Sequence, residues 1–376
     1  MKNFFLLSGT SFLVTFFLFP VLIKVFKKKN YFDSPGGRKI HTVETPSMGG
    51  VPVFIGFAIS AMIWIPWEQL QEIKYVLSAL GIIFIIGFRD DFINLRAIQK
   101  LIGQLAAALI IVAVCDIRLL SFYGLFGIYE LSEVWSYGIS VFTIIVITNA
   151  FNLADGIDGL AGSIGIIASI FFGTWFYLTG FEAYALISFA LVGGLLAFLH
   201  FNWAPSKVFM GDTGSLFIGF FLSIVSIKFI ESNYSISAEL SQWQFQAFVG
   251  TVVAILIIPL FDTSRVFVRR MLKGKSPMHP DRTHIHHILL RLGCNHAQAT
   301  GILITVNVIF VLLALVLKYF GDIVVLPVIL VTAFALGTIL DQIFKSAIDQ
   351  RKEELKDRNR EQRGEAKVVS ISRSAS

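Results

Sequence analysis

The feature that most constrains this chain is a series of apolar runs, each about 20 residues long, that recur along almost its whole length. They are continuous blocks rather than amphipathic stripes, so lipid is the solvent that fits them. We therefore predict an all-α, polytopic integral membrane protein with about 11 transmembrane helices, 10 being the alternative count. The runs lie at 4–26, 47–66, 75–88, 99–117, 134–151, 160–179, 183–201, 213–231, 245–264, 299–319 and 323–344.

Composition supports a membrane protein. The 376 residues are 55% hydrophobic and 15% charged, whereas soluble domains carry about 25% charged residues. The first apolar run is too long for the core of a signal peptide and no small-residue cleavage site follows it. We therefore interpret it as a retained first helix.

The basic residues predict the orientation. Cytoplasmic loops of membrane proteins carry an excess of Lys and Arg, and most of the 31 basic residues fall in inner segments if the N-terminus is outside. We therefore predict an outer N-terminus, a transmembrane domain over 1–345 with a cytoplasmic loop at 265–298, and a charged, partly disordered cytoplasmic tail over 346–376. Because topology accounts for the net charge of +6, no nucleic-acid partner is expected.

Five polar segments interrupt this apolar chain, and the predicted topology places all of them on the inner face. Ionisable groups at a membrane edge are costly and indicate function. The segments are 36–41 with 46–50, then 88–94, 149–162, 209–215 and 279–287. The first is glycine-rich and basic, so it is either a phosphate-binding loop or simply a flexible basic loop.

The segment 149–162 gives the strongest functional signal. Asn149, Asn152, Asp155 and Asp158 recur every three residues, which on a helix lines one face with amides and carboxylates. Two Asp-Gly pairs then predict a break in the helix at the membrane edge. Oxygen ligands three residues apart can reach one hard cation.

The acidic pair Asp90 and Asp91 ends another apolar run. Adjacent carboxylates repel each other unless they share a cation or a proton, so this pair is suited to binding Mg²⁺ or to acting as a base. The alternative is a structural pair in a short turn, balanced by Arg89 and Arg96.

Two further segments are ambiguous by themselves. Asp212 lies where an apolar helix begins, so it is either a helix cap or a metal ligand beside bound phosphate. His284 and His287 have a spacing that zinc sites use, but no Cys pair or HExxH motif accompanies them. A phosphate- or substrate-binding loop fits the mixture of Arg and His better.

In combination and in this order, the motifs FRDDF, NAFNLADGIDGLAG, FMGDTGS and PDRTHIHH resemble the polyprenyl-phosphate N-acetylhexosamine-1-phosphate transferases. The resemblance covers the chain up to about residue 345. The branch that acts on UDP-MurNAc-pentapeptide typically has three consecutive histidines, whereas Ile285 interrupts them here. This difference favours the branch that acts on UDP-GlcNAc.

The resemblance implies transfer of GlcNAc-1-phosphate from UDP-GlcNAc to undecaprenyl phosphate, giving undecaprenyl-diphosphate-GlcNAc and UMP. It also implies a Mg²⁺ cofactor, for which Mn²⁺ can substitute, an active site on the cytoplasmic face of the bacterial inner membrane, and a bilayer-embedded enzyme that can form a homodimer. The reaction is the first membrane step in making cell-envelope polysaccharides of the O-antigen, enterobacterial common antigen or teichoic acid type.

The motifs carry the family's site residues onto this chain. The metal ligands implied are Asn152 and Asp212. The catalytic residues implied are Asp90, Asp91 and Lys100, with Asp90 nearest the attacking phosphate and Lys100 on the lipid phosphate. The substrate-binding residues implied are Asn149, Asp155, Asp158, Arg265, His284, His286 and His287.

Two other functions compete with an enzyme. Secondary transporters place ionisable residues near the midplane of broken helices and often contain internal repeats, whereas the charges here crowd one edge. A scaffold that acts through its charged tail would leave the segments around Asn152 and Asp212 unexplained.

The first prediction concerns Asp90. We expect Asp90→Asn to reduce turnover by orders of magnitude while the protein stays folded, because the change removes a charge beside the reacting phosphate and alters little else. Turnover of the purified variant and its elution in size-exclusion chromatography measure the two properties. Turnover near that of the wild type would rule out the catalytic role.

Overall fold

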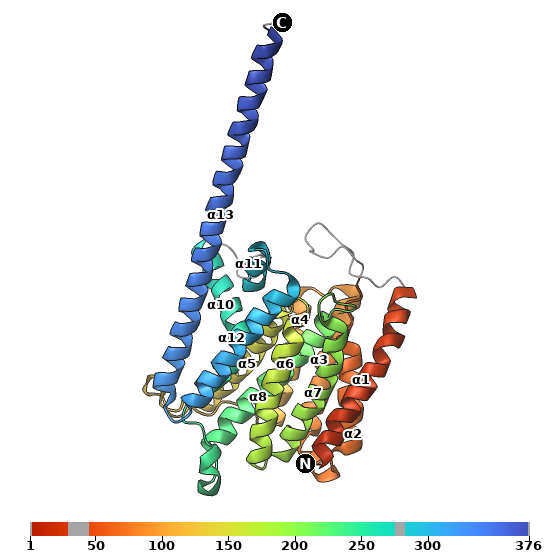
Figure 1. Cartoon of the computed structure of the whole chain (residues 1–376). Coiled ribbons are helices and arrows are strands. Elements are labelled where there is room, and N and C mark those ends of the chain that lie inside the picture. The colour runs from red at the N-terminus through yellow and green to blue at the C-terminus, as the bar shows by residue number, and fades with distance from the viewer. Residues whose placement is uncertain (1, 29–44, 275–282, 375–376) are drawn as a thin grey trace.

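The computed structural model describes residues 2–28, 45–274 and 283–374. These ranges are helical apart from their loops and one isolated β-bridge between Ser121 and Glu130, which confirms the all-α prediction (Figure 1). The α-helices are α1 Lys2–Lys28, α2 Gly50–Trp64, α3 Trp67–Ile93, α4 Ala97–Leu109, α5 Glu133–Ala154, α6 Leu160–Leu178, α7 Glu182–Asn202, α8 Gly211–Tyr234, α9 Phe248–Ile255, α10 Ile257–Leu272, α11 Ile285–Arg291, α12 His296–Val316 and α13 Asp322–Ser374.

Each predicted apolar run coincides with helix in the structure. In the described part of the chain, eight helices are long and apolar enough to cross a membrane, or nine if the bent pair α9 and α10 is one span. Helix α2 is apolar but has only 15 residues. The chain is therefore a multi-pass membrane protein, while the count of eleven spans stays a prediction.

The run 245–264, predicted as one span, is bent in the structure. Helices α9 and α10 meet at an angle of 65°. Pro259, in the first turn of α10, has no N–H to donate and its ring crowds the carbonyl of Ile255, four residues earlier. That carbonyl instead accepts a hydrogen bond from Asn307 Nδ2 of α12 at 2.9 Å. The break is thus compensated by a buried amide from another helix.

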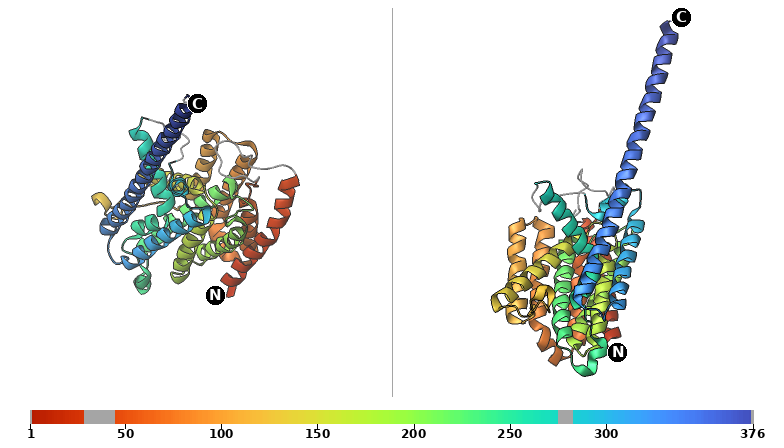
Figure 2. Two further views of the ribbon diagram at one scale, coloured as in Figure 1. Left: turned by 45° about the horizontal axis from the view of Figure 1, so that its top comes forward. Right: turned by 90° about the vertical axis from the view of Figure 1, so that its left-hand side faces the viewer.

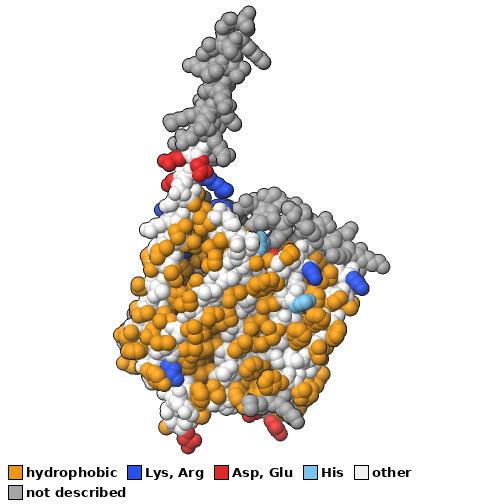
Figure 3. All heavy atoms as spheres, in the orientation of Figure 1, with side chains coloured by type: hydrophobic (Ala, Val, Ile, Leu, Met, Phe, Trp, Pro, Cys, Tyr) orange, Lys and Arg blue, Asp and Glu red, His pale blue; other side chains and the backbone are white. Residues whose placement is uncertain are grey.

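Helix α8 is the centre of the bundle. In its apolar stretch 94% of the residues are buried inside the protein, against 22% in the apolar stretches of α1 and of α13. The face in Figure 3 is dominated by hydrophobic side chains, and most charged side chains in view lie toward its two ends. This distribution matches a helical bundle whose middle is in lipid and whose ends are in water.

Small residues allow the helices to approach closely. A Cβ at Gly193 of α7 would overlap the carbonyl oxygen of Ser8 in α1, and a Cβ at Gly50 of α2 would overlap the backbone of Gly214 in α8. Such contacts are typical of membrane helices. Burial of apolar side chains gives no driving force in lipid, so close packing of the backbones supplies the attraction between helices.

The two ends of the bundle are not equivalent. The α3–α4 turn and α11 lie at the end from which α13 projects, while α1 begins at the opposite end (Figures 1 and 2). Helix α13 continues without a break through residue 345, so the predicted charged tail starts inside a helix. Which end faces the cytoplasm stays a prediction.

The packing of α7 on α1 gives a second prediction. We expect Gly193→Ala to lower the melting temperature by several degrees, because overpacking a tight contact costs roughly 1–3 kcal/mol. Thermal unfolding in detergent, followed by tryptophan fluorescence, measures the change. The matched control is Gly81→Ala in α3, where a new Cβ would meet no atom within 4 Å; an equal effect of the two substitutions would contradict the close packing.

Candidate active site

Asp90 and Lys100 meet where α3 turns into α4. Asn94 ends α3 in the left-handed conformation, with a φ of 49°, and this reverses the chain. Asp90 is buried, and its Oδ1 accepts a hydrogen bond from the backbone N–H of Leu95 at 2.6 Å. Its Oδ2 lies 3.0 Å from Lys100 Nζ. The turn itself therefore builds a buried ion pair.

Lys100 also connects this turn to the central helix. Its Nζ donates to Asp212 Oδ1 at 2.7 Å, and the same oxygen accepts from Asn152 Nδ2 at 2.5 Å. Asn152 Nδ2 also donates to Ser215 Oγ at 2.7 Å. Predicted site residues from α3, α4, α5 and α8 thus lie in one hydrogen-bonded cluster, named here the Lys100 cluster: Asp90, Lys100, Asn152 and Asp212.

Asp91 caps the N-terminus of α8. Its Oδ1 accepts from the backbone N–H of Asp212 at 2.7 Å, and its Oδ2 accepts from the N–H of Thr213 at 2.9 Å and from the Thr213 hydroxyl. Carboxylates are stabilised at a helix N-terminus by the free N–H groups there. A helix cap was one of the two interpretations of Asp212 in the sequence; the residue that caps α8 is Asp91, from a different helix.

Glycine is required beside this cap. Gly211 has a φ of 73°, and a Cβ there would overlap the carbonyl of Ser47 and approach the Asp91 carboxylate. The backbone of segment 46–50 runs alongside: Gly50 N–H donates to Met210 O at 2.9 Å. One polar segment predicted from the sequence is therefore part of the wall of the site.

The turn between α5 and α6 forms a second part of the site. Asp155 follows the last residue of α5, and Gly159, with a φ of 79°, precedes α6. Asn202 of α7 fixes this turn, since its Oδ1 accepts from Gly159 N–H at 2.8 Å and its Nδ2 donates to Val208 O at 2.7 Å. The break predicted from the two Asp-Gly pairs is confirmed.

The histidines approach this turn from the other side. A Cβ on Gly156 would overlap Nε2 of His286, so the imidazole lies directly against the turn. The His286 ring stacks on His284 with centroids 5.7 Å apart and contacts His287 at 4.3 Å. Burial lowers the pKa of His286 to about 3, so its imidazole is neutral at physiological pH.

The α11–α12 segment is tied to the same turn through Asp158. Asp158 Oδ2 lies 3.3 Å from His296 Nδ1, and the Asp158 carbonyl accepts from the Thr300 hydroxyl at 2.7 Å. The loop predicted to bind substrate and the acidic turn are therefore neighbours, although more than 100 residues separate them in the chain.

Two of the predicted substrate residues are engaged elsewhere. The Asn149 amide pairs with Gln104 of α4, donating from Nδ2 to Oε1 at 2.7 Å. The guanidinium of Arg265 lies 2.7 Å from Asp341 Oδ1 of α13 and 3.5 Å from Asp262 Oδ1. Their roles in binding substrate stay predictions. Residues 36–41 and 279–282 of the predicted polar segments lie outside the described residues.

Sequence reasoning missed the acidic partner of the histidines. Asp262 Oδ2 lies 2.9 Å from His284 Nδ1, and Asp262 Oδ1 accepts from the backbone N–H of Ile285 at 2.9 Å. Asp262 is an ionisable residue inside the apolar run 245–264. The rule that such residues indicate function would have identified it. Asp341 and Gln104, which lie in or beside other apolar runs, carry the same signal.

The acidic groups outnumber the cations around the Lys100 cluster. Asp155 is the clearest case: burial, together with the smaller effects of the charges of Asp212 and Asp91, raises its pKa to about 8. Burial likewise raises the pKa of Asp91 to about 7, although Thr213 donates hydrogen bonds to it. Burial and mutual repulsion therefore make both carboxyls harder to ionise than a free carboxyl.

The donor set suits a hard cation. Asp212 offers a carboxylate, and no described residue donates to the amide oxygen of Asn152. Mg²⁺ commonly takes one or two protein oxygens, with phosphates and water for the rest. In the described part of the chain no three His, Cys, Asp or Glu side chains are grouped to hold a metal.

The fold and the site together define a multi-pass membrane protein with an acidic, polar site at one end of its bundle. The sequence profile of Glycosyl transferase family 4 matches residues 73–230. A "Probable undecaprenyl-phosphate N-acetylglucosaminyl 1-phosphate transferase" of Bacillus subtilis (strain 168) is 31% identical over 310 residues, covering 82% of this chain and 83% of the relative.

Gram-negative relatives are similar to the same extent. An "Undecaprenyl-phosphate alpha-N-acetylglucosaminyl 1-phosphate transferase" of Escherichia coli O157:H7 is 30% identical over 308 residues, covering 78% of this chain and 80% of the relative. The protein of the same name in Yersinia pestis is 30% identical over 305 residues, with the same coverage. The chain belongs to this family of membrane transferases, as the motifs predicted, and it is an enzyme.

The raised pKa of Asp155 gives a third prediction. The unfolded carboxyl ionises near its ordinary pKa of 3.8, whereas the folded one stays protonated up to about pH 8. Between these two pKa values, rising pH therefore lowers the free energy of unfolding. An Asn at 155 cannot ionise, so the variant does not lose stability in this way. We expect the melting temperature of Asp155→Asn to exceed that of the wild type by more at pH 8 than at pH 5.

Thermal unfolding in EDTA at the two pH values measures this difference. EDTA removes divalent ions that would stabilise the ionised carboxylate. Asp349→Asn is the control, because Asp349 is an exposed carboxylate on α13 whose recorded partner is Lys352. If the difference in melting temperature between Asp155→Asn and the wild type does not increase from pH 5 to pH 8, the raised pKa of Asp155 is contradicted.

Proposed function

We propose that this enzyme transfers GlcNAc-1-phosphate from UDP-GlcNAc to undecaprenyl phosphate, giving undecaprenyl-diphosphate-GlcNAc and UMP. The observation that carries the proposal is the Lys100 cluster, in which one ammonium, two carboxylates and one carboxamide from four helices converge at one end of the bundle. The activity named for the relatives supports the same reaction. A lipid phosphate and a soluble sugar nucleotide can meet only at such an edge.

The reaction joins two highly charged groups, so positioning and charge neutralisation are the main tasks. Lys100 is the cation within the site, and it would hold the phosphate of the lipid acceptor. That phosphate is already mostly ionised at pH 7 and needs no strong base to attack. Asp90, buried at 3.0 Å from Lys100 Nζ, would keep the ammonium directed into the site.

Asp212 and Asn152 would hold Mg²⁺, or Mn²⁺ in its place. When bound, the metal supplies charge neutralisation on the diphosphate of the donor. The two carboxylate oxygens of Asp91 accept hydrogen bonds from backbone N–H groups at the start of α8. Asp91 would thereby fix the backbone that carries Asp212. This assigns Asp91 to holding the ligand in place, while Asp90 faces Lys100.

The second part of the site would bind the donor. Asp155 and Asp158 lie in the turn after α5, and the neutral imidazole of His286 lies against Gly156. Neutral imidazoles and carboxylates can exchange hydrogen bonds with a uracil, ribose or acetamido group. We assign this surface to the nucleotide and sugar, with His284 and His287 beside it.

The active site would lie on the cytoplasmic face of the bacterial inner membrane. Sugar nucleotides are made in the cytoplasm, and the predicted inner loops hold most of the basic residues. The long polar extension of α13 leaves the bundle at the end that carries the site (Figure 1). Topology and location are thus proposals that rest on charge and on substrate access.

One observation favours a transporter, namely the broken helix formed by α9 and α10. Transporters use the free backbone groups at such breaks to coordinate ions. Here the freed carbonyl of Ile255 is occupied by Asn307, and the acidic cluster lies at the end of the bundle. The transferase remains the better explanation.

A fourth prediction tests the reaction directly. With purified protein, undecaprenyl phosphate and Mg²⁺, we expect radiolabel from UDP-GlcNAc to enter the lipid phase and UMP to be released in equal amount. If label enters the lipid only from a different UDP-sugar, the protein is still a sugar-1-phosphate transferase but its donor is not UDP-GlcNAc. Transport of label into vesicles without lipid product would replace the proposal by the transporter.

The metal is tested in the same assay. EDTA should abolish transfer, and either Mg²⁺ or Mn²⁺ should restore it. Asp212→Asn should require at least ten times more Mg²⁺ for half-maximal rate, because a carboxylate ligand is lost. Asp349→Asn serves again as the control, and an unchanged metal requirement of Asp212→Asn would remove Asp212 from the metal site. Mass measurement in detergent reports whether the active species is the homodimer expected for the family.

A further inference from the structure

Arg265 joins two helices at the end of the bundle that carries the site. Its Nη2 lies 2.7 Å from Asp341 Oδ1 of α13, and its Nη1 lies 3.5 Å from Asp262 Oδ1, one turn earlier on α10. Arg269 pairs with the other oxygen of Asp341. The side chains of Arg265 and Asp262 are 7% and 5% exposed, so these charges interact with little screening by water.

The same two residues of α10 hold the backbone on both sides of His284. Arg265 Nη1 donates to the Thr283 carbonyl at 3.3 Å, and Asp262 Oδ1 accepts from the Ile285 N–H at 2.9 Å. Asp262 Oδ2 contacts His284 Nδ1 itself at 2.9 Å. A carboxyl oxygen at this distance from Nδ1 orients the imidazole ring and leaves its Nε2 to a ligand or neighbour.

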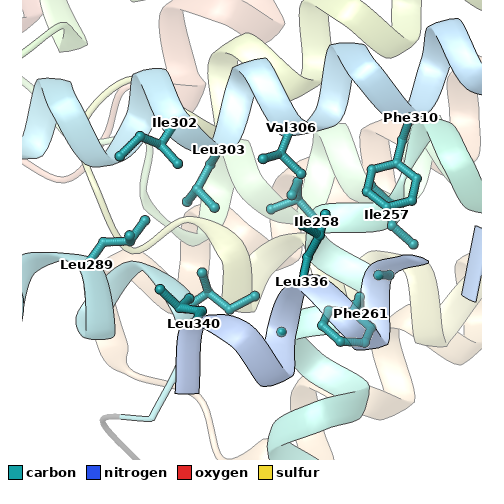
Figure 4. A pocket seen from close by; sticks show the side chains of 13 residues that line it. Ile257, Ile258, Phe261, Leu289, Ile302, Leu303, Val306, Phe310, Leu336 and Leu340 are labelled. Carbon is teal, nitrogen blue, oxygen red and sulfur yellow. The ribbon is translucent and has the colours of Figure 1, made fainter. Parts of the chain in front are cut away.

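Apolar contacts also hold this segment. A half-open apolar pocket of about 170 Å³ lies between α10, α11, α12 and α13. Figure 4 shows Leu289 of α11 on one side of it and Leu336 and Leu340 of α13 on another. Leu289 is buried, so α11 has apolar packing on this side and the polar contacts of Asp262 and Arg265 on the other.

We propose that Asp262 is a positioning residue for the transfer reaction, and that Asp341 of α13 keeps it aligned by holding Arg265. The chain of contacts runs from α13 through Asp341, Arg265 and Asp262 to His284. From there the stacked imidazole of His286 reaches the turn at Gly156. The last membrane helix is therefore part of the apparatus that sets the histidines against the acidic turn.

The kinetic consequence rests on the proposed function, whereas the ordering of the histidine segment does not. Partners that orient a ligand from behind typically change activity by about 10- to 100-fold when they are removed. Asn at 262 has one acceptor oxygen in place of two, so it cannot accept from both His284 Nδ1 and the Ile285 N–H as Asp262 does. Loss of Asp341 removes one anchor of Arg265 and leaves the bonds of Asp262 in place, so its effect should be smaller.

The test compares Asp262→Asn and Asp341→Asn with Asp349→Asn, whose carboxylate lies further along α13 and outside these contacts. Hydrogen exchange of the peptide 283–292, followed by mass spectrometry, reports the ordering. We expect faster exchange in Asp262→Asn, a smaller acceleration in Asp341→Asn and none in the control. Exchange in Asp262→Asn equal to the wild type would overturn the proposal, whatever reaction the enzyme catalyses.

Steady-state kinetics separates positioning from a merely structural role. We expect Asp262→Asn to reduce kcat by about 10- to 100-fold and to raise the KM for UDP-GlcNAc, with the KM for undecaprenyl phosphate unchanged. Lower melting temperature with unaltered kcat and KM per folded enzyme would reduce Asp262 to a structural residue. Asp341→Asn, which removes a less buried group, provides the same comparison if Asp262→Asn does not fold.

Discussion

The ammonium of Lys100 is the interaction on which the rest of the site depends. It lies 3.0 Å from Asp90 and 2.7 Å from Asp212, and so one cation joins α3, α4 and α8. Charges near the membrane are costly unless they are paired. The pairing lets these carboxylates sit beside an apolar bundle, and it holds the ends of three helices at a common point.

The central helix α8 converts this ion pair into a defined site. Its burial on nearly all sides leaves only its ends for polar chemistry, and its N-terminus offers unpaired N–H groups. Asp91 occupies these groups from α3, so the cap of one helix is supplied by the end of another. Rigid helices with interlocking ends hold Asp212, the proposed metal ligand, with little freedom, as a reaction governed by positioning requires.

Much of the site could be predicted from the sequence because polar and ionisable side chains are costly near lipid, so their presence there indicates function. Asn152 and Asp212, 60 residues apart, were expected to act together and do lie in contact. The break at 155–159 was likewise expected from its Asp-Gly pairs. Asp91 illustrates the limit: its sequence neighbour Asp90 faces Lys100, while Asp91 faces α8. Successive residues on a helix point in directions about 100° apart, and only the packing decides which direction reaches the site.

The sequence by itself determined the class of fold, because runs of apolar residues leave the chain no alternative to membrane helices. It also determined the inventory of chemical groups and the family to which the chain belongs. The tertiary structure decided which groups are partners. Asn149 is held by Gln104, Arg265 by Asp341, and His284 by Asp262. Each of these contacts joins separate helices, and helix packing is a property of whole surfaces that no local pattern of residues records.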